Sequence, residues 1–179
     1  LAWMEDMVPW MYTDQYVRLK NSTTIPVCTG EDIYLKEGFE TLIKAGGVSI
    51  IHPDILTCGG ALELKKIADI ADEHGVAVAV HMAESPIACM AAVHTAAAMH
   101  NVLAVEFHSI DVPWWTDMVK GLPQPLIQHG FIQVPEKPGL GIEELNEELL
   151  AQHVNPGIPG MWEPTDEYNC EFSNDRIWS

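Results

Sequence analysis

Short apolar segments alternate with amphipathic segments through residues 1–110, and this alternation is the feature that most constrains the fold. One amphipathic segment carries an apolar stripe at helical spacing, formed by Leu64, Ile67 and Ala71. Parallel strands joined by right-handed helical crossovers satisfy such a repeat. The expected strands are residues 1–4, 25–30, 48–51, 76–80 and 102–107, and the expected helices are residues 35–45, 61–74 and 86–99.

The repeat stops near residue 110, and we therefore divide the chain into residues 1–110 and residues 111–179. The second region is rich in Trp and Pro at its start, and it predicts a strand at 130–134 and a short helix at 143–152. Residues 155–179 show no periodicity but contain several large apolar side chains. We expect this tail to form an ordered coil packed on a larger body.

Composition excludes several classes of function. The chain has 26 acidic and 9 basic residues and a formal charge of −17, so a nucleic acid or an anionic membrane is not an expected partner. No apolar run approaches the roughly 20 residues that span a bilayer, and the start lacks the basic flank of a signal peptide. The four cysteines form no closely spaced pair, which favours reduced thiols in a soluble, cytoplasmic protein.

Each expected strand ends in a residue that can bind a cation or move a proton. These residues recur at intervals of about 25 positions, the length of one strand–helix unit. They therefore lie at the carboxyl ends of neighbouring parallel strands, which is where α/β proteins bind ligands. One such residue alone would be explained as a solvated acid or a core histidine, but five in consecutive units favour a site. The five are Glu5, Glu31, Asp54, His81 and Glu106.

The chemistry of this set suits proton abstraction next to a carboxylate. Two or three converging carboxylates form a hard oxygen site for Mg²⁺, and such an ion stabilises the charge that develops on a substrate carboxylate. His81 is the natural base: its apolar strand should lower its pKa, while Asp54 should raise it and orient the ring. Glu106 could donate a hydrogen bond to the substrate if neighbouring negative charge keeps it protonated. No Lys or Arg follows these strands, so a lysine base is not expected within this chain.

Six short motifs, in this order and at this spacing, resemble the enolase superfamily. The mandelate racemase subgroup of its mandelate racemase/muconate lactonizing enzyme family matches best, and many members of that subgroup dehydrate sugar acids. The similarity covers nearly the whole chain. The motifs are Trp3-Met4-Glu5-Asp6, Thr29-Gly30-Glu31-Asp32, His52-Pro53-Asp54 with Gly59-Gly60, Val80-His81-Met82, Val105-Glu106 and Pro138-Gly139-Leu140-Gly141.

The resemblance implies the α/β fold of a (β/α)₇β TIM-like barrel, of which this chain is the C-terminal part. It would contain strands four to eight and the C-terminal tail, without the N-terminal capping domain and the first three strands. Five strands cannot close an eight-stranded barrel, so the N-terminal portion of the same enzyme is an expected partner. Alone, the chain should expose the interior residues of the barrel and bind metal weakly. We also expect a homo-oligomer.

The resemblance also implies the residue roles. Glu5 and Glu31 would hold Mg²⁺, His81 and Asp54 would form the general-base dyad, and Glu106 would bind the substrate carboxylate. The reaction would be abstraction of the proton alpha to a carboxylate to give a metal-stabilised enediolate, with dehydration of a small anionic sugar acid as the outcome. Two alternatives stay open: a racemase or epimerase of a 2-hydroxy acid or related carboxylate, and an inactive truncated half-barrel.

Four further residues are candidates for substrate contact. His52 shares the strand face of Asp54, although a role as a core histidine is the favoured explanation. His108 shares the face of Glu106, and a structural role explains it equally well. Met82 follows the proposed base, and Trp114 lies in a loop at the same edge, where packing is the favoured explanation. We expect Asp6 to point away from the proposed metal site because it directly follows Glu5.

Overall fold

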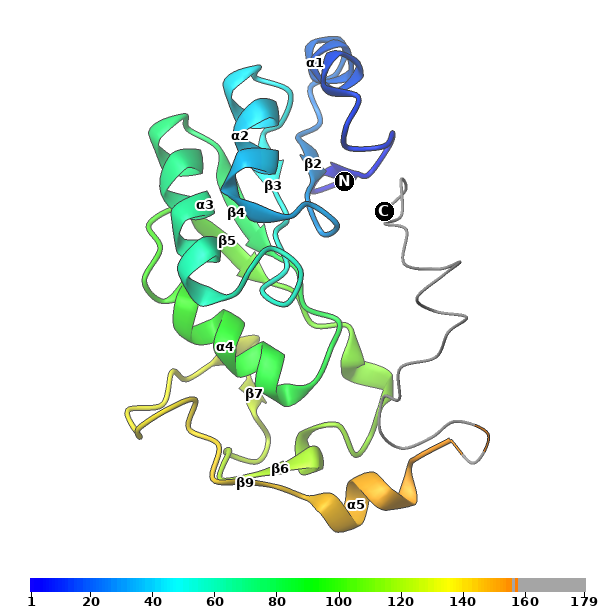
Figure 1. Ribbon diagram of the computed structural model, residues 1–179, viewed down its shortest axis with the longest axis vertical. Coiled ribbons are helices and arrows are strands. Elements are labelled where there is room, and N and C mark those ends of the chain that lie inside the picture. The colour runs from blue at the N-terminus through cyan, green and yellow to red at the C-terminus, as the bar shows by residue number, and fades with distance from the viewer. Residues whose placement is uncertain (156, 158–179) are drawn as a thin grey trace, which may run out of the picture.

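The computed structural model describes residues 1–155 and 157, and its centre is a five-stranded parallel sheet (Figure 1). The strands follow one another in chain order. Sequential order is the winding of a barrel, whereas a doubly wound sheet reverses its order at a switch point. The prediction of parallel strands in an α/β fold is therefore confirmed. The strands are β1 (Met4–Glu5), β2 (Val27–Thr29), β3 (Ile50–Ile51), β4 (Ala77–Val80) and β5 (Val102–Val105).

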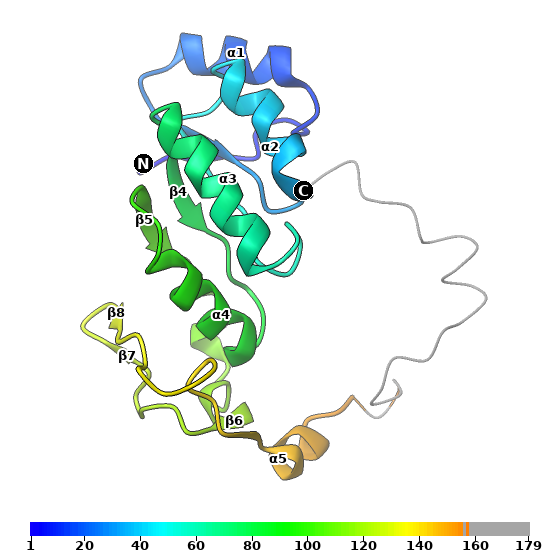
Figure 2. The same cartoon turned by 60° about the vertical axis from the view of Figure 1, so that its left-hand side comes forward.

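A helix follows each of the first four strands. Figures 1 and 2 show α2, α3 and α4 side by side on one face of the sheet, as the predicted crossovers require. The helix after β1 was not predicted, because its sequence is polar and only Tyr16 is buried, which leaves no apolar stripe to recognise. The helices are α1 (Thr13–Ser22), α2 (Leu35–Lys44), α3 (Ala61–Glu73) and α4 (Pro86–Ala96).

The two faces of the sheet have separate apolar cores. The side chains of alternate strand residues pack against the helices in the main core, which includes Val27, Ile51, Val78 and Val80. The opposite face holds a smaller cluster of Cys28, Ile50 and Ala79, against which Trp3 and Ala77 pack. The three central residues of this cluster are at most 5% exposed. The expectation that interior residues lie open is therefore wrong for them, because they pack against one another and against Trp3 and Ala77.

In contrast to this buried cluster, the edge strand β5 has an exposed apolar side chain. Leu103 of β5 is 58% exposed, and Phe131 is 77% exposed nearby across a groove that both residues line. The edge of β5 has no strand partner among the described residues. The absence of a further partner strand beside β5 among the described residues agrees with the prediction that the five strands do not close a barrel on their own.

The region after residue 110 is built from short elements. It contains the 3₁₀ turns η1 (Ser109–Asp111) and η2 (Thr116–Met118), the strands β6 (Val119–Lys120), β7 (Ile127–Gln128), β8 (Phe131–Ile132) and β9 (Glu144–Leu145), and the helix α5 (Glu147–Gln152). The predicted strand near 130–134 exists as β8. The predicted helix at 143–152 begins four residues later, because β9 pairs with β6 and Asn146 caps α5 by accepting a hydrogen bond from the Leu149 N–H. Apart from residues 155 and 157, the predicted coil at 155–179 lies outside the described residues.

None of the described helices is long and apolar enough to cross a membrane.

Gly30 lies between β2 and Glu31, so its backbone conformation determines where the Glu31 side chain is placed. Its φ of +148° belongs to a region that L side chains rarely adopt. A Cβ atom at this position would lie 2.8 Å from the Phe39 ring and 2.9 Å from the backbone nitrogen of His52. Glycine therefore permits the close packing that places Glu31 at the carboxyl edge.

We expect Gly30→Ala to lower the free energy of unfolding by about 3 kcal/mol, because backbone strain and overpacking both penalise the new Cβ. Gly46→Ala is the matched control: its φ is also positive, at +70°, but nothing lies within 4 Å of the new Cβ. That change should cost about 1 kcal/mol. Chemical denaturation of both variants measures the difference, and equal losses would contradict the packing role of Gly30.

Candidate active site

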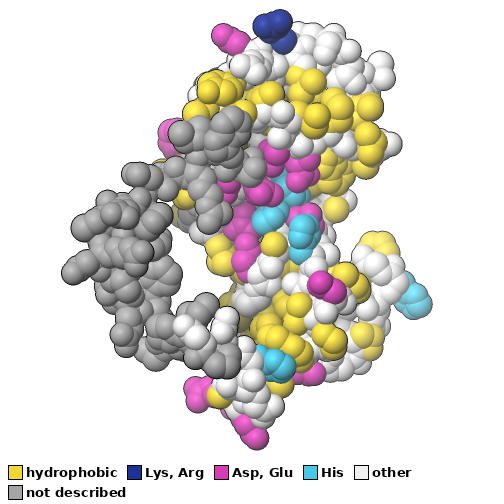
Figure 3. All heavy atoms as spheres, turned by 90° about the vertical axis from the view of Figure 1, so that its right-hand side faces the viewer, with side chains coloured by type: hydrophobic (Ala, Val, Ile, Leu, Met, Phe, Trp, Pro, Cys, Tyr) yellow, Lys and Arg dark blue, Asp and Glu magenta, His cyan; other side chains and the backbone are white. Residues whose placement is uncertain are grey.

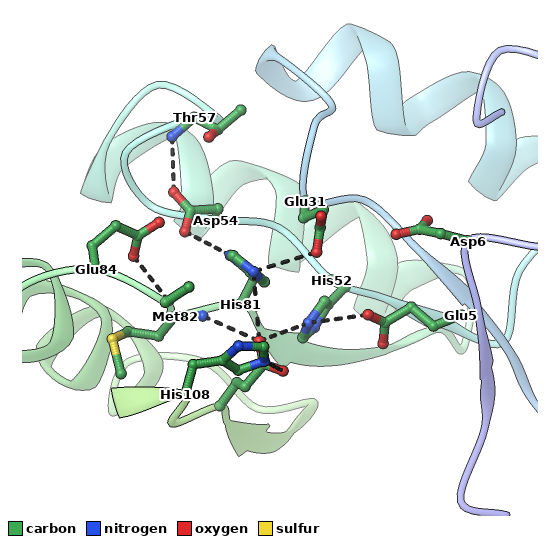
Figure 4. A network of polar contacts seen from close by, with 12 residues as sticks. Glu5, Asp6, Glu31, His52, Asp54, Thr57, His81, Met82, Glu84 and His108 are labelled. Atoms are coloured by element: carbon green, nitrogen blue, oxygen red, sulfur yellow. Dashed lines mark hydrogen bonds and ion pairs between the residues drawn. The ribbon is translucent and has the colours of Figure 1, made fainter. Parts of the chain in front are cut away.

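The structure brings all five predicted strand-end residues to one edge of the sheet. An isolated parallel bridge joins Asp54 to His81, and Figure 4 shows Glu31 and Glu5 on one side of this pair. Glu106 also lies close to the pair, because its Oε2 atom is 3.7 Å from His81 Nε2. Figure 3 shows acidic and histidine side chains gathered in the middle of the corresponding face, with hydrophobic side chains above and below them. The near-constant spacing of these residues in the sequence therefore becomes a cluster in space.

A group of three carboxylates forms one side of this edge. Glu5, Asp6 and Glu31 each offer an oxygen, and these oxygens lie within 4.8 Å of one another. The expectation that Asp6 points away is wrong, because its left-handed backbone (φ 47°) breaks the alternation of a strand. The Thr29 hydroxyl donates a hydrogen bond to Asp6 and fixes it there. Three hard oxygen donors suit Mg²⁺, so the residues present fit the metal that the resemblance implies.

The His81–Asp54 pair forms the centre of the edge. His81 Nδ1 lies 2.9 Å from Asp54 Oδ2, and the other carboxylate oxygen accepts hydrogen bonds from the backbone N–H groups of Leu56 and Thr57. Burial alone would raise the pKa of Asp54, but these hydrogen bonds lower it. The ring orientation directs His81 Nε2 toward Glu31, at 3.3 Å, and toward Glu106, at 3.7 Å.

The hydrogen bond to Asp54 is the main reason that the pKa of His81 rises to about 9. Burial acts in the opposite direction, as the sequence analysis expected, and the charges of Glu31 and Glu106 add to the rise. In the metal-free protein at neutral pH, His81 is therefore protonated.

Glu84 is a member of the site that the sequence analysis missed. It belongs to the same group as Asp54 and His81, with side-chain ligand atoms within 4.8 Å of one another. Burial and its contact with Asp54 raise the pKa of Glu84. Trp115 Nε1 donates a hydrogen bond of 2.7 Å to the Glu84 carbonyl and holds the loop in place. The residue lies in a loop beyond the strand end, where no periodic pattern marks it.

Three histidines surround the carboxylate of Glu106. His52 Nε2 is 3.1 Å from Oε2, His108 Nε2 is 2.6 Å from Oε1, and His81 lies beyond Oε2. Burial would raise the pKa of Glu106, but the histidines lower it overall. The condition that neighbouring negative charge keeps Glu106 protonated is therefore not met in the metal-free protein, because histidines rather than acids are its nearest ionisable neighbours.

The four candidate substrate residues lie in different surroundings, and their roles stay predictions. His108 is exposed and contacts Glu106. His52 is 1% exposed, and the Met82 side chain is buried in an apolar cluster, with only its backbone N–H near Glu106, at 3.5 Å. Trp114 stacks on the ring of His153 with a centroid distance of 3.8 Å, which agrees with the packing alternative.

The fold and the site together define a class of protein: a parallel α/β barrel unit with acid–base and carboxylate groups at the carboxyl edge of its strands. Residues 1–149 match the model of the enolase C-terminal domain-like family. The chain therefore belongs to that family, and its fold is the C-terminal part of a TIM barrel.

Individual relatives agree with this assignment. The D-xylonate dehydratase of Haloferax volcanii is 45% identical over 155 residues, which cover 87% of this chain and 37% of that protein. The D-galactonate dehydratase of Variovorax paradoxus is 32% identical over 158 residues, covering 86% of this chain and 41% of that protein. A mandelate racemase/muconate lactonizing enzyme-like protein from Rubrobacter xylanophilus superposes with a TM-score of 0.83 at 38% identity, covering 89% of this chain and 40% of that one. The chain thus spans about two fifths of the length of these relatives.

We expect Asp54→Asn to lower the pKa of His81 from about 9 toward the ordinary value near 6.5, because the largest cause of the rise is removed. The titration of the His81 ring protons, followed by NMR in the metal-free protein, measures this change. Asp69→Asn, on the exposed surface of α3, is the control and should leave the titration unchanged. A midpoint that is equal in Asp54→Asn and the wild type would contradict the geometry of the dyad.

Proposed function

We propose that the full-length protein is a lyase that removes water from a sugar acid after abstraction of the proton alpha to its carboxylate. One observation carries this proposal: the Nε2 atom of His81, oriented by Asp54, faces the carboxylate group of Glu5, Asp6 and Glu31. A base thus lies beside a set of metal-binding oxygens, the arrangement that the abstraction of a weakly acidic C–H proton requires. The names of the dehydratase relatives support sugar acids as the substrate class.

Glu5 and Glu31, with Asp6 beside them, would hold Mg²⁺. When bound, Mg²⁺ supplies positive charge that stabilises the negative charge developing on the substrate carboxylate. Asp6 was not among the predicted ligands, and its hydrogen bond from Thr29 suits a residue that both orients the cluster and adds an oxygen to it.

His81 takes the proton in this proposal. The bond between the alpha carbon and its hydrogen breaks, and the proton moves to His81 Nε2. The electron pair of that bond forms a double bond to the neighbouring carbon as the hydroxyl on that carbon leaves. The hydroxyl receives the proton from His81, so that one water molecule is lost, and the enol that remains rearranges to a keto acid. The hydrogen bond to Asp54 is the main reason that the pKa of His81 is about 9 in the metal-free protein, and the charge of Glu31 adds to the rise. Neutralising Glu31 would therefore lower the pKa of His81 and favour its base form.

Glu106 lies on the other side of His81 and is our candidate for binding the substrate carboxylate. Its ionised state in the metal-free protein means that it must take up a proton before it can donate a hydrogen bond to that anion.

The alternative within the same chemistry is a racemase or epimerase. Dehydration is favoured because His81 is the single base that we assign at this edge, whereas isomerisation between two faces needs a second proton donor opposite it.

We expect the full-length protein, supplied with Mg²⁺, to convert D-xylonate or D-galactonate to a dehydrated keto acid and to lose this activity with a chelator. A panel of sugar acids, with the product followed by reaction of its new carbonyl group, makes the measurement. Racemised or epimerised substrate without keto acid would favour the isomerase. No change in any substrate would contradict the proposal.

Two substitutions separate the base from the metal ligands. His81→Asn should slow exchange of the substrate alpha proton with solvent deuterium by at least about 100-fold while leaving Mg²⁺ affinity nearly intact. Glu31→Gln should weaken Mg²⁺ binding first, because it removes a charged ligand. His100→Asn, at a fully solvated surface position, is the matched control for both measurements. Wild-type exchange in His81→Asn, or an unaltered Mg²⁺ titration in Glu31→Gln, would remove that residue from its role.

A further inference from the structure

His52 lies inside the candidate active site without a function in the proposed reaction. It follows β3 two residues before Asp54, and at 1% exposure its ring has no open surface for a substrate. Its side chain nevertheless reaches two acidic residues of the site and the ring of the proposed base (Figure 4). A buried ring with this many partners is placed to hold other groups in position.

One of its contacts fixes the ring. His52 Nδ1 lies 2.6 Å from the backbone carbonyl of Ala79 in β4. A carbonyl oxygen only accepts hydrogen bonds, so Nδ1 carries the proton and Nε2 is directed at the site. The edge of the His52 ring also meets the His81 ring, with centroids 5.2 Å apart and planes at 85°. The β4 backbone therefore sets the orientation of His52.

The other nitrogen lies between the two sides of the site. Nε2 is 3.1 Å from Glu106 Oε2 and 3.8 Å from Glu5 Oε1. Because the proton on Nδ1 is used by Ala79, the shorter contact needs one further proton between Nε2 and Oε2. With that proton the contact is a hydrogen bond, which holds Oε2 from the buried side.

The second histidine on Glu106 differs in burial. The His108 side chain is 59% exposed and contacts Oε1, the opposite oxygen. Without His52, Oε2 would keep, among the described residues, only the long contact with the Met82 N–H and the distant His81 ring. Glu106 would then be free to change rotamer, because an exposed partner can move with it.

We propose that His52 is a positioning residue, which holds Glu106 beside His81 and connects it to Glu5 on the metal-binding side. This inference rests on the proposed function for its effect on catalysis. Its geometric part, the fixed position of Glu106, can be measured without turnover. His52 thus acts through Glu106 and does not contact the substrate.

The test compares His52→Gln and His52→Leu in the full-length protein. Gln retains an amide that can donate a hydrogen bond to Glu106, whereas Leu fills a similar volume without one. We expect kcat to fall by about 10- to 100-fold in His52→Leu and by less in His52→Gln, with a smaller change in KM. A role in packing alone predicts the reverse order, because an apolar side chain suits a buried position better than an amide.

His94→Gln is the matched control. His94 Nε2 is also buried, but it has no hydrogen-bond partner and lies on α4, outside the site. This variant should keep the wild-type kcat. Chemical denaturation of all three variants shows whether a loss of kcat comes from a loss of folded protein.

The ring resonances of His108 report the position of Glu106 independently of activity. They should shift in His52→Leu and stay in place in His94→Gln, because His108 contacts the carboxylate that His52 holds. Unchanged His108 resonances in a folded His52→Leu variant would overturn the inference. Absence of turnover in the wild type would contradict the proposed function, while the His108 resonances would still decide the role of His52.

Discussion

The accumulation of negative charge at the carboxyl edge of the sheet is the constraint on which the rest of the site depends. Glu5, Asp6 and Glu31 face one another there, and Glu106 lies close by. Like charges at these distances repel strongly where solvent is partly excluded. In the metal-free protein the compensation comes from histidines, which contact Glu106 and Glu31. The raised pKa of His81 and the lowered pKa of Glu106 are two results of the same arrangement.

Much of the fold could be predicted from the sequence because its strands and helices repeat with a clear hydrophobic period. The segments that were missed or misplaced lack that period. Helix α1 buries only Tyr16, and α5 begins where Asn146 caps it rather than where the apolar pattern begins. The burial of Cys28 and Ile50 also escaped prediction, because it depends on Trp3, which reaches them only in the folded sheet.

In the candidate site too, some residues could be predicted from the sequence pattern and others could not. The five strand-end residues could be predicted because a parallel sheet converts equal sequence spacing into neighbouring positions. Asp6 joins them through a left-handed backbone conformation, and Glu84 joins them from a loop; neither feature leaves a signal in the residue pattern. The lowered pKa of Glu106 could not be predicted from the sequence, because it depends on a buried contact with His52 that forms only in the tertiary structure.

The central claim is that the acidic edge is a metal centre positioned beside a histidine base. A crystal of the full-length protein soaked with Mn²⁺, a stand-in for Mg²⁺ with a measurable anomalous signal, tests this claim most directly. We expect an anomalous peak about 2 Å from carboxylate oxygens of both Glu5 and Glu31. A fully occupied ion elsewhere in the protein, with no peak between these two residues, would contradict it.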